Sequence, residues 1–289
     1  MKKITLLILL FGFLQVTMAQ KPAYKIFDSE GRNVTYDKMF TEITTSDVVF
    51  FGELHNNPIV HWLELCILKD AHAEVKRTVK AGYEMFEADD QIIIDEYLNK
   101  KIKHKHFKKE AKIWPNYDTD YRPMIEYAFK NNVEVIATNI PRRYASMVAR
   151  GGFESLQELS DKAKNYIAPL PVDYDPNLPG YNKMLEMSKM HGMKSNKNLP
   201  KAQAIKDATM GWFINENYEE GNLFIHYNGT YHSNNKEGII WYLNKYSDMD
   251  LQIITIATSE QEILKNLNEK NKGIADFIIV IPDDMTKTH

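Results

Sequence analysis

A run of four apolar residues, VVFF at 48–51, constrains the fold of this chain more than any other feature. The run has no polar alternation, and Asp47 and Gly52 bound it on either side. Such a run is typical of a strand in a parallel sheet, where helices cover both faces. Pro58 then stands at the first position of a predicted helix over residues 58–73, with Asn57 as its N-cap. Together the two elements predict a buried strand followed by a helix.

The same alternation of strand and helix repeats along the chain. Further strands are predicted over residues 78–85, 133–138, 222–226, 251–257 and 277–281, with helices over 89–99, 123–130, 142–149, 236–245 and 259–268. Residues from about 155 to 211 are mostly helical instead, and the loop APLPVDYDPNLPGYN interrupts them. This pattern predicts one α/β domain over residues 20–289, with a mostly parallel central sheet, helices on both faces and a helical insertion at about 155–211.

The first 19 residues have the pattern of a cleaved signal peptide. Lys2 and Lys3 precede an apolar run over 4–14, and small residues stand at 17 and 19, where a signal peptidase would cut. We therefore expect an exported protein, periplasmic or secreted. The single cysteine, Cys66, lies far from that cleavage site, so neither a lipid anchor on an N-terminal Cys nor an internal disulfide is expected. A net charge of −3 does not suggest a nucleic-acid partner.

Polar and ionisable residues follow the predicted strands at the point where each strand ends. In open α/β sheets, ligands bind outside the carboxyl ends of the strands, so these side chains are expected to form one rim. Glu84 interrupts an apolar strand, where a buried carboxylate needs a partner. For Glu53 and His55, helix capping is an equal alternative. His61, one turn into the helix, either points back toward the rim or packs in the core. The predicted rim comprises Glu53, His55, Glu84, Asn139, Arg142, His226 and His232.

Two G-x-x-H turns, at 52–55 and 229–232, flank the Glu-bearing second strand in the sequence. With the segments GELHNNPIVHW, GYEMFEADDQIIIDEYL, KAQAIKDATMGWFI and GTYHSNNKEGIIWYL, they make the chain resemble the ChaN-like haem-binding proteins. Those proteins belong to the broader Tiki and erythromycin-esterase superfamily. The resemblance covers roughly residues 40 to 258, and it is specific as a set of segments.

The resemblance implies an α/β fold with a helical lid and a cleft at the strand ends. Relatives of this kind are either exported haem-binding proteins linked to iron acquisition or hydrolases. Our first hypothesis is haem binding in haem or iron uptake, and the second is a metal-dependent hydrolase. In the hydrolytic branches, the Glu and His residues of these motifs bind metal or activate water. Carried over to this chain, the catalytic residues or divalent-metal ligands would be Glu53, His55, Glu84 and His232.

Haem requires an apolar slot, an axial Tyr, His or Met ligand, and cations for its propionates. The lid segment PGYNKMLEMSKMHGMKSN offers such ligands, and Arg142 at a strand end offers a cation. The predicted haem-binding residues are Tyr181, His191, Tyr174, Met187, Met190, Arg142 and His61. The expected partners are haem, a second copy of the chain that forms a homodimer around the haem, and outer-membrane uptake machinery. A third hypothesis is Cu(I) binding, since repeated Met-x-x-Met with a His suits that ion.

Overall fold

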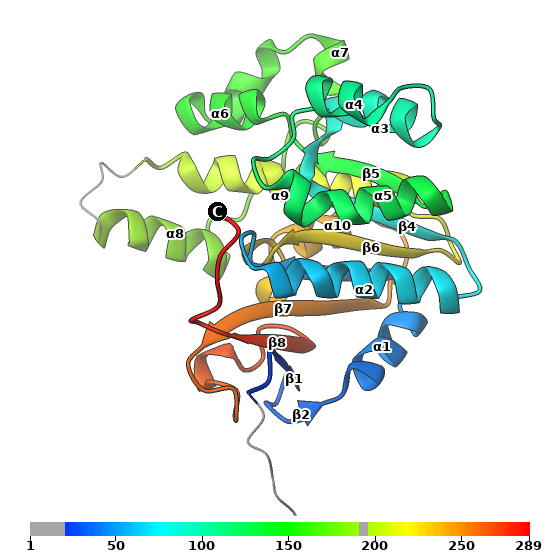
Figure 1. Cartoon of the computed structure of the whole chain (residues 1–289). Coiled ribbons are helices and arrows are strands. Elements are labelled where there is room, and N and C mark those ends of the chain that lie inside the picture. The colour runs from blue at the N-terminus through cyan, green and yellow to red at the C-terminus, as the bar shows by residue number, and fades with distance from the viewer. Residues whose placement is uncertain (1–20, 191–195) are drawn as a thin grey trace, which may run out of the picture.

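The computed structural model of this 289-residue chain describes residues 21–190 and 196–289 (Figure 1). Its strands are β1 (Lys25–Asp28), β2 (Asn33–Val34), β3 (Val48–Glu53), β4 (Val79–Glu87), β5 (Glu134–Asn139), β6 (Leu223–Gly229), β7 (Ile253–Gln261) and β8 (Phe277–Pro282). They form one eight-stranded sheet with the order β2-β1-β8-β7-β3-β6-β4-β5. The predicted signal peptide over residues 1–19 lies outside the described residues.

Six strands, β3 to β8, run parallel to one another, and at one edge β1 pairs antiparallel with both β8 and β2. The predicted mostly parallel α/β sheet is therefore confirmed. The strand order does not follow the chain, because β6 inserts between β3 and β4. This insertion brings the turn after β6 between the ends of β3 and β4, which bear the rim carboxylates Glu53 and Glu84.

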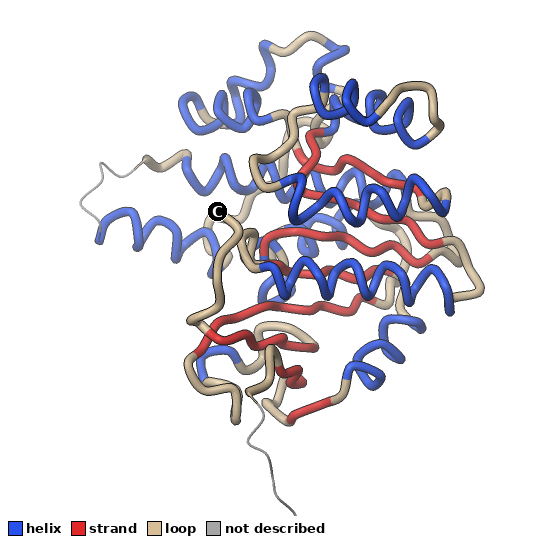
Figure 2. The backbone as a smooth tube through the Cα atoms, in the orientation of Figure 1, coloured by secondary structure: helices blue, strands red, loops and turns tan. Residues whose placement is uncertain are grey.

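Helices cover both faces of the sheet (Figures 1 and 2). They are α1 (Tyr36–Thr45), α2 (Pro58–Glu74), α3 (Gln91–Leu98), α4 (His104–Glu110), α5 (Arg122–Asn131), α6 (Arg142–Gly151), α7 (Asp161–Lys164), α8 (Pro179–Met190), α9 (Leu199–Asn217) and α10 (Ile239–Tyr246). On one face α2 and α5 pack on the sheet, and on the other face α9 and α10 do so, with α6 beside α9. None of the helices in the described residues combines the length and apolar character needed to span a bilayer.

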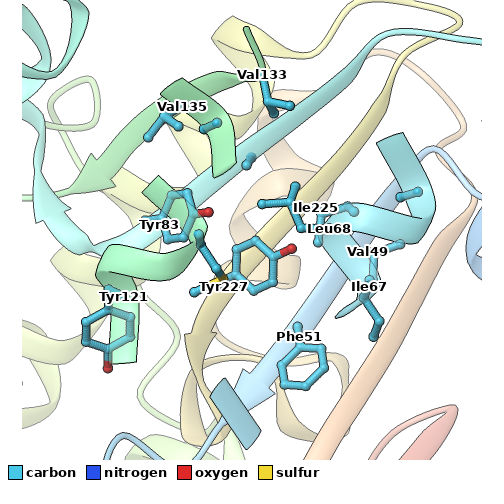
Figure 3. Close-up of a cluster of buried hydrophobic side chains, with 14 of the residues drawn as sticks. Val49, Phe51, Ile67, Leu68, Tyr83, Tyr121, Val133, Val135, Ile225 and Tyr227 are labelled. Carbon is cyan, nitrogen blue, oxygen red and sulfur yellow. The ribbon is translucent and has the colours of Figure 1, made fainter. Parts of the chain in front are cut away.

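The apolar run that begins β3 explains why both faces must be covered. Because side chains alternate along a strand, Val49 and Phe51 pack under α2, in the cluster drawn in Figure 3. Val48 and Phe50 point the other way and pack against residues of α9 and α10. All four side chains are fully buried. Each contributes about 1.5–3 kcal/mol relative to an exposed side chain, so this strand anchors two helical layers at once.

The predicted helix over residues 259–268 is wrong. Strand β7 continues through Gln261, and Ser259 to Gln261 pair with the end of β8. The ladder to β8 overrides the local helix-forming character of the segment. The Gln261 side chain then organises the following loop, since its amide donates to the carbonyls of Ile263 and Asn266 and its oxygen accepts from the Asn268 amide.

The predicted helical insertion contains α7, α8 and most of α9, which continues to Asn217. Helix α8 lies beside α9, and its first turn is attached to the segment that follows β6 (Figure 1). The Gly180 amide donates to Glu237 Oε2 at 2.9 Å, and the Tyr231 hydroxyl donates to the Gly180 carbonyl. The start of α8 is therefore held by the residue next to His232 in the sequence.

Gly52 permits the close approach of β3 to the turn after β6. A Cβ at this position would lie 2.8 Å from Thr230 Cα and 3.0 Å from the Ile256 carbonyl oxygen. Both contacts are with backbone atoms, which cannot rotate away as a side chain can. A larger residue at position 52 would therefore have to displace a neighbouring strand or turn.

We predict that Gly52→Ala lowers the free energy of unfolding by about 1–3 kcal/mol, because the methyl group forces the two segments apart. Gly151→Ala is the control, since its Cβ would meet only the Ser155 side chain, at 3.1 Å. Urea unfolding of both variants measures the difference. Equal stability of Gly52→Ala and wild type would show that the turns do not need this contact.

Candidate functional site

The two G-x-x-H turns pack into each other at the carboxyl ends of β3 and β6. Glu53 is the register partner of Gly229 on the neighbouring strand. A Cβ on Gly229 would lie 2.6 Å from His55 Nε2, so the absence of a side chain makes room for the imidazole of the first turn. Gly52 makes room for the second turn in the same way. The two G-x-x-H turns, far apart in the sequence, therefore form a single packed unit in the structure.

The first turn contains a carboxylate–imidazole pair. His55 Nδ1 hydrogen-bonds to Glu53 Oε1, which also accepts from the Tyr121 hydroxyl at 2.7 Å. Burial alone would raise the pKa of Glu53, but the imidazoles of His55 and His61 hold that pKa below its usual range. Burial lowers the pKa of His55, and the Glu53 carboxylate more than offsets this, so the pKa is raised. An imidazole oriented by a carboxylate is the arrangement of a general base.

The second turn contains an imidazole held between two carboxylates. His232 Nε2 lies 3.2 Å from Glu84 Oε1, and His232 Nδ1 hydrogen-bonds to Asp207 Oδ1. Gly229 donates its backbone N–H to Glu84 Oε2 at 2.7 Å. Burial opposes charge on His232, but the two carboxylates raise its pKa to about 10. Burial likewise opposes charge on Glu84, whose pKa His232 lowers to about 2. His232 is therefore an imidazolium at neutral pH.

A cavity of about 420 Å³ opens above these two pairs. A second cavity, of about 600 Å³, shares Glu87, Trp114 and Arg142 with the first, so the two form one cleft along the strand ends. Within the described part of the chain, neither Arg142 nor Lys206 has a carboxylate within salt-bridge distance. The first cavity is lined by His55, Glu84, Glu87, Trp114, Asn139, Ile140, Arg142, Lys206 and His232.

The structure brings five residues of the predicted rim onto one cavity wall, and Glu53 hydrogen-bonds to one of them from beneath. His226 is the exception. It is fully buried, and Thr138 and Asn228 hydrogen-bond its two ring nitrogens. Burial lowers the pKa of His226 to about 4, so it is a neutral residue with a structural role. Its place in the predicted rim is therefore wrong, because its side chain lies beside Phe50 on the face of the sheet that α9 and α10 cover, three residues before β6 ends.

The predicted haem-binding residues occupy different environments. Tyr181 is buried and donates its hydroxyl to Asp207 Oδ2 at 2.8 Å, and the Tyr174 ring centroid lies 5.7 Å from that of Tyr181. His61 is buried beneath the cleft, where its Nε2 lies 3.6 Å from Glu53 Oε2. Arg142 alone among the described members of this set lines the strand-end cleft.

Three of the predicted haem-binding residues belong to a less fully described segment. Met187 and Met190 lie on α8, but their side chains are outside the described part of the structure. His191 is itself outside the described residues. Their part in ligand binding stays a prediction.

Three residues near the site have no role predicted from the sequence: Asp207, Tyr121 and Glu64. Asp207 fixes the His232 ring, and its sequence signal is a single carboxylate in the stretch AQAIKDATM. Tyr121 has no comparable signal, because it reaches Glu53 from a π-helical turn far along the chain. Glu64 is fully buried on α2, three residues after His61.

Comparison with known proteins agrees with this fold. The profile of the family described as "Haem-binding uptake, Tiki superfamily, ChaN" matches residues 39–243. The chain therefore belongs to this family of haem-binding uptake proteins, which confirms the resemblance predicted from its sequence motifs. No curated protein matches the chain significantly.

Two solved structures show the same fold. ChaN of Campylobacter jejuni, described with cofacial haem binding, superposes with a TM-score of 0.64 at 18% identity, covering 89% of this chain and 96% of that one. A Bacillus cereus protein superposes with a TM-score of 0.50 at 14% identity, covering 84% of this chain and 90% of that one. These likenesses concern the fold.

We predict that the His232 imidazole titrates near pH 10 in the folded chain. Since its unfolded pKa is about 6.5, its charge stabilises the fold fully below that pH, and this contribution is lost as pH rises through about 10. Asp207→Asn removes one of the two negative charges, so the midpoint should fall. Histidine NMR titration measures both. The exposed substitution Asp250→Asn is the control, and an unchanged midpoint in Asp207→Asn would contradict the assignment.

Proposed function

We propose that this chain is an exported haem-binding protein that acts in haem or iron uptake. The observation that carries the proposal is the cleft at the strand ends, in a chain that belongs to a haem-binding uptake family. The predicted signal peptide supports export.

The cleft suits a haem in size and charge. Ligand cavities are typically about 300–1,000 Å³, and the two connected cavities measure about 420 and 600 Å³. Trp114, Ile113 and Pro115 supply apolar surface for a porphyrin face. Arg142 and Lys206 would bind the propionates through charge-assisted hydrogen bonds. Bound haem would supply an iron centre, and these residues would orient it.

The axial ligand is proposed to come from the lid and not from His232. The Glu53 carboxylate hydrogen-bonds to His55 Nδ1. Carboxylates also contact both ring nitrogens of His232. The imidazole of His232 is therefore already engaged on both sides by protein atoms, which favours a ligand from another segment.

The lid offers Tyr181, Tyr174 and His191 as the proposed ligands. Tyr181 would first have to release its hydrogen bond to Asp207. A homodimer around the haem would cover an otherwise open apolar slot. Outer-membrane uptake machinery is the proposed partner for delivery.

The hydrolase and Cu(I) hypotheses stay predictions. A hydrolase would use the Glu53–His55 pair, which has the arrangement of a general base. The Cu(I) hypothesis depends on Met187 and Met190, whose side chains lie outside the described residues.

We predict that hemin titration of the purified chain produces a shifted Soret band. Arg142→Gln should weaken hemin binding about tenfold, which corresponds to about 1.4 kcal/mol, because it removes one propionate contact. Arg150→Gln is the matched control, since Arg150 lies two turns further along α6 and lines neither cavity. Absence of a Soret shift with saturating folded protein would overturn the proposed function.

Tyr181→Phe and His191→Ala test the axial ligand in the same titration. Loss of the iron-bound phenolate or imidazole changes the position of the absorption bands without requiring loss of binding. Unchanged spectra in both variants would exclude Tyr181 and His191 as ligands.

A further inference from the structure

A second cluster of ionisable side chains lies beneath the cleft, between the end of β3 and the first turns of α2. It consists of Glu53, His61 and Glu64, which are 1%, 4% and 0% exposed. His61 and Glu64 stand three residues apart on α2, so both face the end of β3. The proposed haem site does not need His61 or Glu64 in this position.

The polar atoms of this cluster lack partners. Among the described residues, ten buried side-chain polar atoms have no hydrogen bond, and five of them belong to these three side chains. They are Glu53 Oε2, both ring nitrogens of His61 and both carboxylate oxygens of Glu64. Leaving one such atom unsatisfied costs about 1–3 kcal/mol, and more for a charged group. Five in one place indicate a ligand that contacts all three residues.

We propose that Glu53, His61 and Glu64 bind a divalent transition-metal ion. One ligand atom from each residue lies within 4.8 Å of the other two. His61 Nε2 and Glu53 Oε2 are 3.6 Å apart, which is too long for a hydrogen bond. Two ligands about 2.1 Å from a tetrahedral zinc ion lie about 3.4 Å apart, so this spacing suits a shared metal.

The surrounding residues provide the outer contacts that metal ligands need. His61 Nδ1 lies 3.3 Å from Asp120 Oδ2 without the geometry of a hydrogen bond, so Asp120 is the carboxylate placed to accept the Nδ1 proton when Nε2 binds the metal. Asp120 Oδ2 accepts from Asn116 at 2.6 Å and from Thr288 at 2.7 Å, so its position is fixed.

The Glu53 carboxylate is fixed through its other oxygen. Tyr121 donates to Oε1 at 2.7 Å, and His55 hydrogen-bonds to the same atom. These two contacts set the plane of the carboxylate and leave Oε2 for the metal.

Charge and chemistry select the class of ion. No Lys or Arg of the described residues forms a salt bridge with Glu53 or Glu64, so two adjacent buried carboxylates lack a fixed cation. One imidazole and two carboxylates suit Zn²⁺, Mn²⁺ or Fe²⁺, whereas Mg²⁺ and Ca²⁺ prefer ligand sets made of oxygen alone. Aromatic residues lie beside Glu64, since the Tyr227 hydroxyl donates to its carbonyl at 3.4 Å. The Tyr83 and Tyr227 rings stack with centroids 5.0 Å apart (Figure 3).

A cavity reaches one residue of the cluster, His61. The cavity, of about 210 Å³, has His61 and Asp120 on its wall, and Thr288 near the C-terminal end also lines it. This cavity shares none of its lining residues with the strand-end cleft. A metal ion could therefore enter without passing a bound haem.

The test uses the full chain, stripped with a chelator and titrated with Zn²⁺ and, separately, Mn²⁺. We expect one equivalent to bind and to raise the melting temperature, and we expect both effects to be lost in His61→Ala and Glu64→Gln. His72→Ala and Glu74→Gln are matched controls, since both residues are exposed on the same helix. His232→Ala should retain the metal, whereas it would lose the metal if the ion were bound at the strand-end cleft.

The rival explanation is a proton on Glu64, because burial raises the pKa of this carboxyl well above its usual range. In that case, wild type binds neither ion, and Glu64→Gln, which resembles the protonated acid, is at least as stable as the metal-free wild type. That result would overturn the metal site. Neither measurement uses hemin, so failure of this proposal and failure of haem binding are separate outcomes.

Discussion

The mutual packing of the two G-x-x-H turns is the contact on which the rest of the site depends. Parallel pairing of β3 with β6 sets Glu53 opposite Gly229. Each glycine then makes room for the other turn, Gly52 for Thr230 and Gly229 for His55. The Gly229 amide also holds Glu84 from the neighbouring strand β4. One close approach therefore positions both carboxylates and both imidazoles, and the requirement is for space, not for an unusual backbone conformation.

Glu53 connects the cleft to the core. Its Oε1 orients His55 on the cleft floor, and its Oε2 faces His61 on the other side. A group that fixes Oε2 also fixes the carboxylate plane, and with it the His55 ring. A group bound by Glu53, His61 and Glu64, the inner cluster, would therefore also restrain His55 on the cleft floor. This holds even though the two cavities share no lining residue.

Much of the fold could be predicted from the sequence, because strands buried on both faces and capped helices have local signals. Residues 48–51 and Pro58 are examples, and the structure places β3 and α2 there. The insertion of β6 between β3 and β4 had no local signal, since strand order is set by packing of distant segments. The same limit applies to Asp207 and Glu64, whose roles depend on partners from other elements. The helix predicted over residues 259–268 was wrong for a related reason, because pairing with β8 overrode local preference.

The two buried clusters differ in how their charges are balanced. The outer cluster, at the strand ends, consists of Glu84, Asp207 and His232. The His232 imidazolium lies between the two carboxylates, and each of its ring nitrogens faces one of them. In the inner cluster, Glu53 and Glu64 lie beside a His61 ring whose nitrogens make no hydrogen bond. Buried carboxylates and imidazoles are normally hydrogen-bonded to each other. We would therefore expect the residues of the inner cluster to form such pairs if they bound nothing else. The outer cluster is balanced by protein atoms alone, whereas the inner one gathers three potential ligand atoms within 4.8 Å of one another, which is why we propose a metal ion there.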